Sequence, residues 1–516
     1  MLMKLKLYTA ICTALLVGFT SCIDDESGEG GRILPELSIP GSNAENMPIK
    51  NFNLGTECVI DPQIQYNGNK NQLSYTWSMG RYVNNVKEEL TEISKEPVLR
   101  YLFKEGGSYY VHLNVTDGKV GQVIDYQVNI NRTFEEGFIL TSNDESQKGN
   151  IAFVKTMTPE EIEAGIPQVY MEHCITTMNP EVNMTTAVNA SLVTTTWPKT
   201  LTRLTISTDK CCFFLNPNTF TVLTQLNYED IFPGFNATSY ISSSAPGPYA
   251  YDSKMGKFVH LDLTYMFPYE YKYFKDAPAV DDIYMSVTYS NWGTLGQDPF
   301  FVRHDPAMVA LYTQGGYFVT SKDMQKKDIL EGKEVVSAFF SGETNPTTYG
   351  LDRFVITRSK NDANKVQFYQ LSEYAPYGNP DEAYMEVVKQ QELTLTDDMA
   401  MPVRGTRFMQ SPTYKRYFYA LGSKVYVFLN ESNFTFPKKS QPSISFPDNE
   451  EVTYLDVNTE TEELYVATYN TTTKRGNLYI FNTADVRADN TTSPEPKTKH
   501  IGCADRITNI LYKKSI

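Results

Sequence analysis

The stretch Phe134-Glu-Glu-Gly-Phe-Ile-Leu-Thr-Ser142, followed by Lys148-Gly-Asn-Ile-Ala-Phe-Val154, decides the fold of the larger part of this chain. Each half contains a short apolar run, and polar residues separate the two runs. Short apolar runs bounded by turn residues indicate strands, and two in succession indicate an antiparallel pair. The stretch therefore predicts two neighbouring strands of one sheet.

Variants of this strand pair recur to the end of the chain, at 211–215 with 219–223, 257–263, 309–312 with 316–320, 353–357 with 365–369, 417–421 with 424–428, and 463–469 with 477–481. Taking one marker from each pair gives a mean step of about 54 residues, slightly longer than a typical propeller blade. The markers are Phe138, Phe213, Phe258, Ala310, Phe354, Phe418 and Leu464. We therefore expect an all-β fold with a degenerate seven-bladed β-propeller over 134–516, closed by a strand within 505–513. Six or eight blades, or a second large sandwich, are the alternatives.

Two short helices are expected between the strand pairs. Thr158-Pro-Glu-Glu161 places Thr at the N-cap, Pro in the first turn and Glu three residues after the cap, which is the pattern of a capping box. Asn379-Pro-Asp-Glu382 repeats the pattern and predicts a second helix over 383–391.

Residues 35–133 form a separate β-rich region. In 107–117, Tyr109, Val111, Leu113 and Val115 alternate with polar residues, which indicates a strand with one face on a core and one in water. Tyr75-Thr-Trp-Ser-Met-Gly80, followed by Gly106 to Gly118, resembles the polycystic-kidney-disease (PKD) repeat, an immunoglobulin-like β-sandwich. The resemblance implies a spacer or docking module, with Trp77 as a core residue. Met79 and Arg81 depart from the Phe and Asp of the PKD pattern, so no metal or ligand role is carried over to that turn.

The N-terminus has the pattern of a lipoprotein signal. Residues 1–21 begin with Lys4 and Lys6 and continue with an apolar run shorter than the roughly 20 residues that cross a bilayer. Phe19-Thr-Ser-Cys22 looks like a bacterial lipobox, which implies acylation of Cys22 and anchoring through its acyl chains. An ordinary signal peptide with a chance cysteine is the alternative.

Acidic residues and a flexible segment follow the cysteine. Asp24, Asp25 and Glu26 resemble the surface-export signal of Bacteroidetes lipoproteins, and 22–34 is expected to be a tether. The whole layout resembles the PKD-like lipoproteins of Bacteroidetes. That resemblance implies a place on the outer face of the outer membrane, beside a SusC-like TonB-dependent transporter and a SusD-like lipoprotein that import peptides or oligosaccharides.

Composition excludes several other classes of protein. A net charge of −15 over 516 residues repels nucleic acid and anionic lipid headgroups. The five cysteines beyond Cys22 are an odd, scattered set, which makes no disulfide framework, although a bridge from Cys174 to Cys211 or Cys212 remains open. The spacing of Cys and His residues predicts no zinc site, and the chain has no Walker or dinucleotide fingerprint, so we expect no metal and no cofactor. Calcium at 143–145 is a minor alternative.

The sequence predicts no catalytic residues. Adjacent acids occur at 135–136, 281–282, 397–398 and 450–451, but neighbours in a strand point to opposite faces and such pairs in loops are solvated. There is no Gly-x-Ser-x-Gly motif, and the pairs His173-Cys174 and His304-Asp305 lack the context of a nucleophile and its base.

Aromatic residues are the sequence's main sign of binding. Tyr269, Tyr271 and Tyr273 share one side of an extended segment, and Trp292 lies in a further aromatic loop. Such side chains stack on sugar rings or line a peptide, or they pack on a neighbouring blade or protein. We therefore expect a non-catalytic substrate-binding or scaffolding lipoprotein. A propeller enzyme acting on glycans or peptides, and a surface adhesin, are the alternatives.

Overall fold

The computed structural model describes residues 34–515 apart from gaps at 43–46, 54–56, 84–85, 88, 105, 132–133, 164, 166, 169, 196–199, 242–247, 263–264, 271–277, 290–294, 313–317, 321–328, 345–350, 375–381, 383, 412 and 430–433. The chain divides into two compact units. The first consists of 34–52, 57–101 and 107–130, and the second is mainly 131–516. Residues 1–33, with Cys22, Asp24, Asp25 and Glu26, lie outside the described residues.

The first unit is built from antiparallel strands. Its large sheet contains β2 (Ile49–Asn53), β10 (Gly121–Asn131), β9 (Gly107–Thr116), β5 (Ser74–Val83), β6 (Val86–Lys87) and β7 (Thr91–Ser94). Two small sheets pair β1 (Leu37–Ser38) with β4 (Gln65–Tyr66), and β3 (Cys58–Ile60) with β8 (Leu99–Tyr101). A short 3-10 helix, η1, spans Lys70–Gln72.

The core of the first unit follows the predicted alternation. Tyr109, Val111, Leu113 and Val115 of β9 are buried, whereas the residues between them are partly or fully exposed. Trp77 on the adjacent β5 is completely buried, and its indole Nε1 donates a hydrogen bond to the Glu96 carbonyl at 2.8 Å. Trp77 is therefore a core residue, as expected. The likeness of this unit to the PKD repeat stays a prediction.

Seven four-stranded sheets make up the second unit. From the innermost to the outermost strand they are β38 (Arg506–Lys513), β11 (Gly137–Asn143), β12 (Gly149–Lys155) and β13 (Tyr170–Met171); β14 (Ala187–Thr195), β15 (Leu201–Thr208), β16 (Cys211–Leu215) and β17 (Val222–Asn227); β18 (Ser239–Ile241), β19 (Tyr249–Asp252), β20 (Lys257–Leu261) and β21 (Pro268–Glu270); β22 (Asp282–Tyr289), β23 (Leu295–Arg303), β24 (Met308–Tyr312) and β25 (Phe318–Thr320); β26 (Lys333–Thr344), β27 (Leu351–Ser359), β28 (Lys365–Tyr374) and β29 (Tyr384–Thr394); β30 (Met409–Ser411), β31 (Arg416–Leu421), β32 (Lys424–Leu429) and β33 (Ile444–Ser445); β34 (Glu450–Asn458), β35 (Glu463–Asn470), β36 (Arg475–Asn482) and β37 (Thr498–Ala504).

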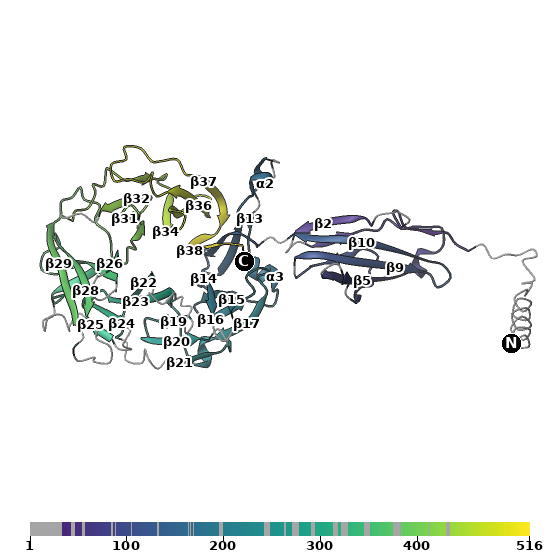
Figure 1. Ribbon diagram of the computed structural model, residues 1–516, viewed down its shortest axis with the longest axis horizontal. Helices are drawn as coiled ribbons and strands as arrows, with labels where there is room; N and C mark the ends of the chain where they lie inside the picture. The colour runs from purple at the N-terminus through teal and green to yellow at the C-terminus, as the bar shows by residue number, and fades with distance from the viewer. Residues whose placement is uncertain are drawn as a thin grey trace, which may run out of the picture. The chain divides into compact units, whose positions relative to one another are not determined.

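These sheets are the blades of a closed propeller (Figure 1). The innermost strands neighbour one another in the order β14, β18, β22, β26, β30, β34, β38, and β38 returns to β14. The last strand, β38, pairs antiparallel with β11, the first strand of the unit, and so joins the two ends of the chain in one blade. Lys513 on β38 is buried and donates from Nζ to the Phe134 and Glu135 carbonyls at 2.7 and 2.6 Å. The all-β fold, the seven blades and the closing strand are confirmed.

The core of the propeller lies between neighbouring blades. Six apolar clusters each combine residues of two adjacent sheets, for example Phe339 of β26 with Tyr417 of β31. Because both faces of a blade are covered in this way, its strands are nearly continuous apolar runs. All five cysteines among the described residues are buried and unpaired. Burial raises the pKa of the Cys174 thiol to about 12, so this thiol is protonated and inert.

The helices are short, and one prediction about them is wrong. The described helices of this unit are α2 (Pro159–Glu163), α3 (Cys174–Met178) and the 3-10 helix η2 (Tyr228–Asp230). The capping box at α2 is confirmed, because Glu161 N donates to Thr158 Oγ1 at 3.3 Å and Thr158 N donates to Glu161 Oε2 at 3.0 Å. The helix predicted over 383–391 is instead β29, which pairs along its length with β28.

Candidate functional site

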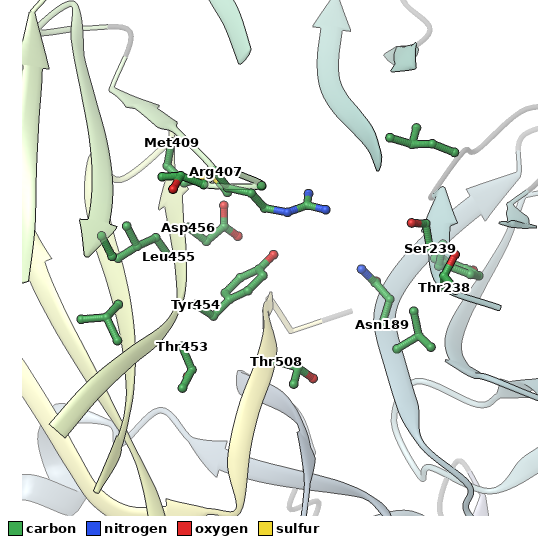
Figure 2. A pocket seen from close by; sticks show the side chains of 17 residues that line it. Asn189, Thr238, Ser239, Arg407, Met409, Thr453, Tyr454, Leu455, Asp456 and Thr508 are labelled. Carbon is green, nitrogen blue, oxygen red and sulfur yellow. The ribbon is translucent and has the colours of Figure 1, made fainter. Parts of the chain in front are cut away.

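A cavity of about 580 Å³ lies among the innermost strands of the propeller (Figure 2). Its wall comes from β14, β18, β22, β34 and β38 and from the segment that leads into β30. The lining residues are Val188, Asn189, Thr238, Ser239, Tyr240, Ile283, Gly405, Thr406, Arg407, Met409, Ala420, Val452, Thr453, Tyr454, Leu455, Asp456 and Thr508. Residues from six of the seven blades therefore meet around one cavity.

Asp456 is the carboxyl group of this wall. It lies in β34, two residues after Tyr454, so both side chains leave the strand on the same face. Asp456 Oδ1 accepts a hydrogen bond from Val457 N at 2.8 Å, and the side chain is partly accessible. Burial raises the pKa of Asp456 to about 7, and the hydrogen bond from Val457 only partly opposes that rise. The carboxyl group can therefore take or release a proton near neutral pH.

Tyr454 brings a hydroxyl group to the same part of the cavity. Its oxygen accepts a hydrogen bond from Asn509 Nδ2 on β38 at 3.1 Å, which leaves the hydroxyl hydrogen available. Burial and the nearby Asp456 carboxylate raise the pKa of Tyr454 well above its usual range. The backbone bulges between Val452 and Tyr454, which turns Val452 and Thr453 together into the cavity wall.

Arg407 supplies the positive charge of the wall. It precedes β30, its side chain is exposed within the cavity, and its Cζ lies 5.3 Å from the centre of the Tyr284 ring. Stacking on an aromatic face holds the plane of a guanidinium while leaving its edge free. Figure 2 shows the guanidinium of Arg407 reaching toward the middle of the cavity, with the Asn189 amide on the opposite side.

The remaining lining groups are neutral. Hydroxyl groups of Thr238, Ser239 and Thr508 and the amide of Asn189 are interleaved with small and apolar residues. A concave, mixed surface with a few convergent polar groups is typical of a small-molecule site. Among the described lining residues there is one carboxyl group and no histidine, so they do not include the pair of acids that glycoside hydrolysis usually needs.

The predicted aromatic site is not described by the structure. Tyr271, Tyr273 and Trp292 lie outside the described residues. The backbone of Tyr269 belongs to β21, where it pairs with His260, but its side chain is also outside the description. A binding role for these four residues therefore stays a prediction, as do the lipidation of Cys22 and the export role of Asp24, Asp25 and Glu26.

Two of the adjacent acid pairs lie in hydrogen-bond networks. Asp282 Oδ2 accepts from His304 Nε2 at 2.7 Å, and Asp281 Oδ2 accepts from His304 N at 2.7 Å. Glu450 Oε2 accepts hydrogen bonds from Thr468, Asn477 and Tyr479. Both sets of contacts join strands rather than open onto the cavity.

Residues 143–145, the possible calcium site, also form structural contacts. Asn143 exchanges two hydrogen bonds with the Ala187 backbone, at 3.0 and 2.8 Å, and so joins two blades. Asp144 accepts from two backbone amides of its own turn, and Glu145 pairs with Lys474 at 3.0 Å. No group of three potential metal ligands is found in the part of the chain that the structure describes.

Sequence reasoning missed the axial cavity. Asp456 was visible as an acid inside the apolar strand Thr453-Tyr-Leu-Asp-Val457, and charged residues within such strands are rare without a partner. Arg407 carried no such signal, because it follows a turn in which charged residues are ordinary. Only the ring of blades brings these two segments together.

No family model and no curated protein matches the chain. Among solved structures, a quinonprotein alcohol dehydrogenase-like protein from Bacteroides thetaiotaomicron is similar over 94% of this chain and 100% of its own, with 10% identity and a TM-score of 0.47. A eukaryotic initiation factor aligns over 74% of this chain and 99% of its own, with 10% identity and a TM-score of 0.34. A Synechocystis apocarotenoid oxygenase mutant aligns over 89% and 96%, with 8% identity and a TM-score of 0.25.

At 8 to 10% identity and TM-scores below 0.5, none of these three structures transfers an activity to this chain. Among the described residues, no helix has the length and apolar character of a membrane span.

Proposed function

We propose that this protein is a non-catalytic binding protein that takes up a small polar solute in the cavity at the propeller axis. The observation that carries the proposal is the pair of oppositely charged groups at the cavity, the Arg407 guanidinium and the Asp456 carboxyl, for which no ion pair is found among the described residues. Arg407 is exposed within the cavity and Asp456 is partly accessible, and ionisable groups that converge on a cavity are candidates for contact with a ligand.

The composition of the cavity wall supports binding rather than catalysis. General acid–base chemistry on a glycan needs two carboxyl groups across the scissile bond, whereas Asp456 is the single acid among the described lining residues. The hydroxyl and amide groups around it are suited to hydrogen-bonding a ligand that keeps its covalent structure. A propeller enzyme acting on glycans or peptides would require a second reacting group at this wall.

Calorimetric titration of the full-length protein with small sugars and peptides tests the proposal. Solutes that bind should be recovered unchanged, and the double variant Arg407→Met/Asp456→Asn should lose the heat of binding. A surface variant such as Lys365→Met, which removes an exposed partner of Glu392, is the matched control. Binding that survives the double variant, or conversion of the solute to product, would contradict the proposal.

We further propose that the protein is a lipoprotein on the outer face of the outer membrane, where it serves a SusC/SusD-like uptake complex for peptides or oligosaccharides. The support is the lipobox ending at Cys22 and the acidic run Asp24, Asp25 and Glu26. Cys22→Ser should release the protein from membranes, and affinity purification of the wild type should recover a TonB-dependent transporter. A wild-type protein found alone in the periplasm would contradict this assignment, and loss of host-matrix binding on deletion of residues 35–133 would favour the adhesin alternative.

A further inference from the structure

The polar groups of the cavity differ in charge and in whether they donate or accept hydrogen bonds. These differences indicate which classes of ligand the cavity can bind. Arg407 provides only donors, and Tyr454 has a hydroxyl hydrogen to donate. When it is ionised, Asp456 provides only an acceptor. A ligand that satisfies Arg407 and Asp456 has an anionic or accepting group at one end and a hydroxyl or ammonium group at the other, and a hydroxyl group would in addition accept from Tyr454.

The Arg407 guanidinium is available to a ligand, in contrast to that of Arg404, which lies three residues earlier in the chain. Arg404 Nη2 pairs with Glu334 Oε2 at 2.8 Å, outside the cavity. Arg407 forms no ion pair with an acid in the described part of the chain, and its Cζ lies 5.3 Å from the centre of the Tyr284 ring. Its guanidinium reaches into the cavity (Figure 2), and the fork of N–H groups on a guanidinium matches the two oxygens of a carboxylate.

The charge of the wall argues against more highly charged ligands. A phosphate ester carries nearly two negative charges and is usually held by several cations or by backbone amides. Here one cation stands alone, and the Asp456 carboxylate on the same wall repels surplus negative charge. A single planar carboxylate balances Arg407 without overloading the site.

Given the binding role proposed above, we infer that the ligand is a small carboxylate-bearing solute whose carboxylate pairs with Arg407 and whose hydroxyl or ammonium group donates to Asp456. A cavity of 580 Å³ admits a solute of the size of a disaccharide or a short peptide. A uronic acid unit and a peptide C-terminus both present this chemistry. They differ at the other end, where the sugar offers hydroxyl groups and the peptide an ammonium group.

Isothermal titration with two matched probe pairs tests this inference. Galacturonic acid is compared with neutral galactose, and trialanine with its C-terminal amide, so that the members of each pair differ in one carboxyl group. The full-length wild type should bind at least one acidic probe at least tenfold more tightly than its neutral counterpart. Arg407→Met should reduce that ratio to near one, Arg407→Lys should keep part of it, and Arg404→Met should leave it unchanged.

The variant Asp456→Asn distinguishes a uronic acid unit from a peptide C-terminus as the source of the carboxylate. This change should weaken the binding of trialanine at least tenfold, because the ammonium group loses its counter-charge, and should leave the binding of galacturonic acid unaffected or slightly tighter. Equal binding of acidic and neutral probes to the wild type, or a ratio that persists in Arg407→Met, would overturn the inference while the binding function stands. Failure of all four probes to bind would count against both.

Discussion

Two carboxyl groups of the same strand, Glu450 and Asp456 of β34, have opposite surroundings. Glu450 is buried at the start of the strand, and its Oε2 accepts from Thr468 Oγ1, Asn477 Nδ2 and Tyr479 OH at 2.9, 3.2 and 3.0 Å. Among the described residues, Asp456 accepts one hydrogen bond, from the backbone of the next residue, and its other oxygen has no hydrogen-bond partner. The first carboxylate holds its blade together, whereas the second lines the axial cavity. A satisfied buried acid indicates structure, and an unsatisfied one beside a cavity indicates a ligand.

The largest effect is expected from removing the satisfied carboxylate. Glu450→Ala removes the acceptor that the buried Thr468 and Asn477 side chains share with the partly buried Tyr479 hydroxyl, and should lower the free energy of unfolding by about 3 kcal/mol. The urea midpoint of the propeller unit measures this loss. Glu460→Ala, which removes an exposed partner of Lys514, is the control and should change the midpoint little. If the urea midpoint of Glu450→Ala equalled that of Glu460→Ala, Glu450 would not have the structural role that distinguishes it from Asp456.

The second effect has the opposite sign. Because Asp456 has a pKa of about 7 in the folded protein, against about 4 when unfolded, the folded state binds more protons between these values. Asp456 therefore costs stability as pH rises through this window, and the full cost is reached above pH 7. Asp456→Asn should stabilise the protein by on the order of 2 kcal/mol at pH 8 and by almost nothing at pH 4. Melting curves at the two pH values measure the difference, and destabilisation at pH 8 would show that the carboxylate has a structural role.

A third acid, Asp282, is satisfied by a titrating partner. His304 donates from Nε2 to Asp282 and from Nδ1 to the Val335 carbonyl at 2.6 Å, so both ring nitrogens carry protons. Burial lowers the pKa of His304, but these hydrogen bonds outweigh it and raise the pKa above its usual value. The stabilisation is complete below about pH 6.5 and is lost as pH rises through the folded pKa. Melting curves should show a loss of about 1 kcal/mol above neutral pH in the wild type, which His304→Gln abolishes. An identical pH profile in both proteins would contradict this assignment.

The smallest effect on stability is expected from the two arginines. Arg404 forms an exposed ion pair and Arg407 is exposed within the cavity, so Arg404→Met and Arg407→Met should each change the free energy of unfolding by less than about 0.5 kcal/mol. The melting temperatures should therefore coincide while ligand titrations separate the two variants. A marked loss of stability in Arg407→Met alone would show that Arg407 supports the wall instead of the ligand.

Local sequence patterns predicted more of the fold than of the candidate site. Each of the seven markers falls in a different blade, although Phe138, Phe354, Phe418 and Leu464 lie in the second strand and Phe213, Phe258 and Ala310 in the third. The number of blades was predicted correctly although the markers lie in different strands, because every blade buries at least two adjacent apolar strands. The helix expected over 383–391 failed for a related reason: a capping pattern is a local preference, and pairing with the long strand β28 outweighed it.

The sequence by itself determined what depends on neighbours in the chain: the strand pairs and their alternation, the capping box at Thr158, the buried Trp77 and the terminal strand that closes the ring. The tertiary structure alone decided which side chains meet at the axis. Arg407 and Asp456 are separated in the chain by a complete blade, and Asn189 and Thr508 lie in β14 and in the closing strand β38, more than 300 residues apart in the sequence. No periodicity along the chain predicts that these side chains lie close together, because their proximity arises from the closure of seven sheets around a common axis.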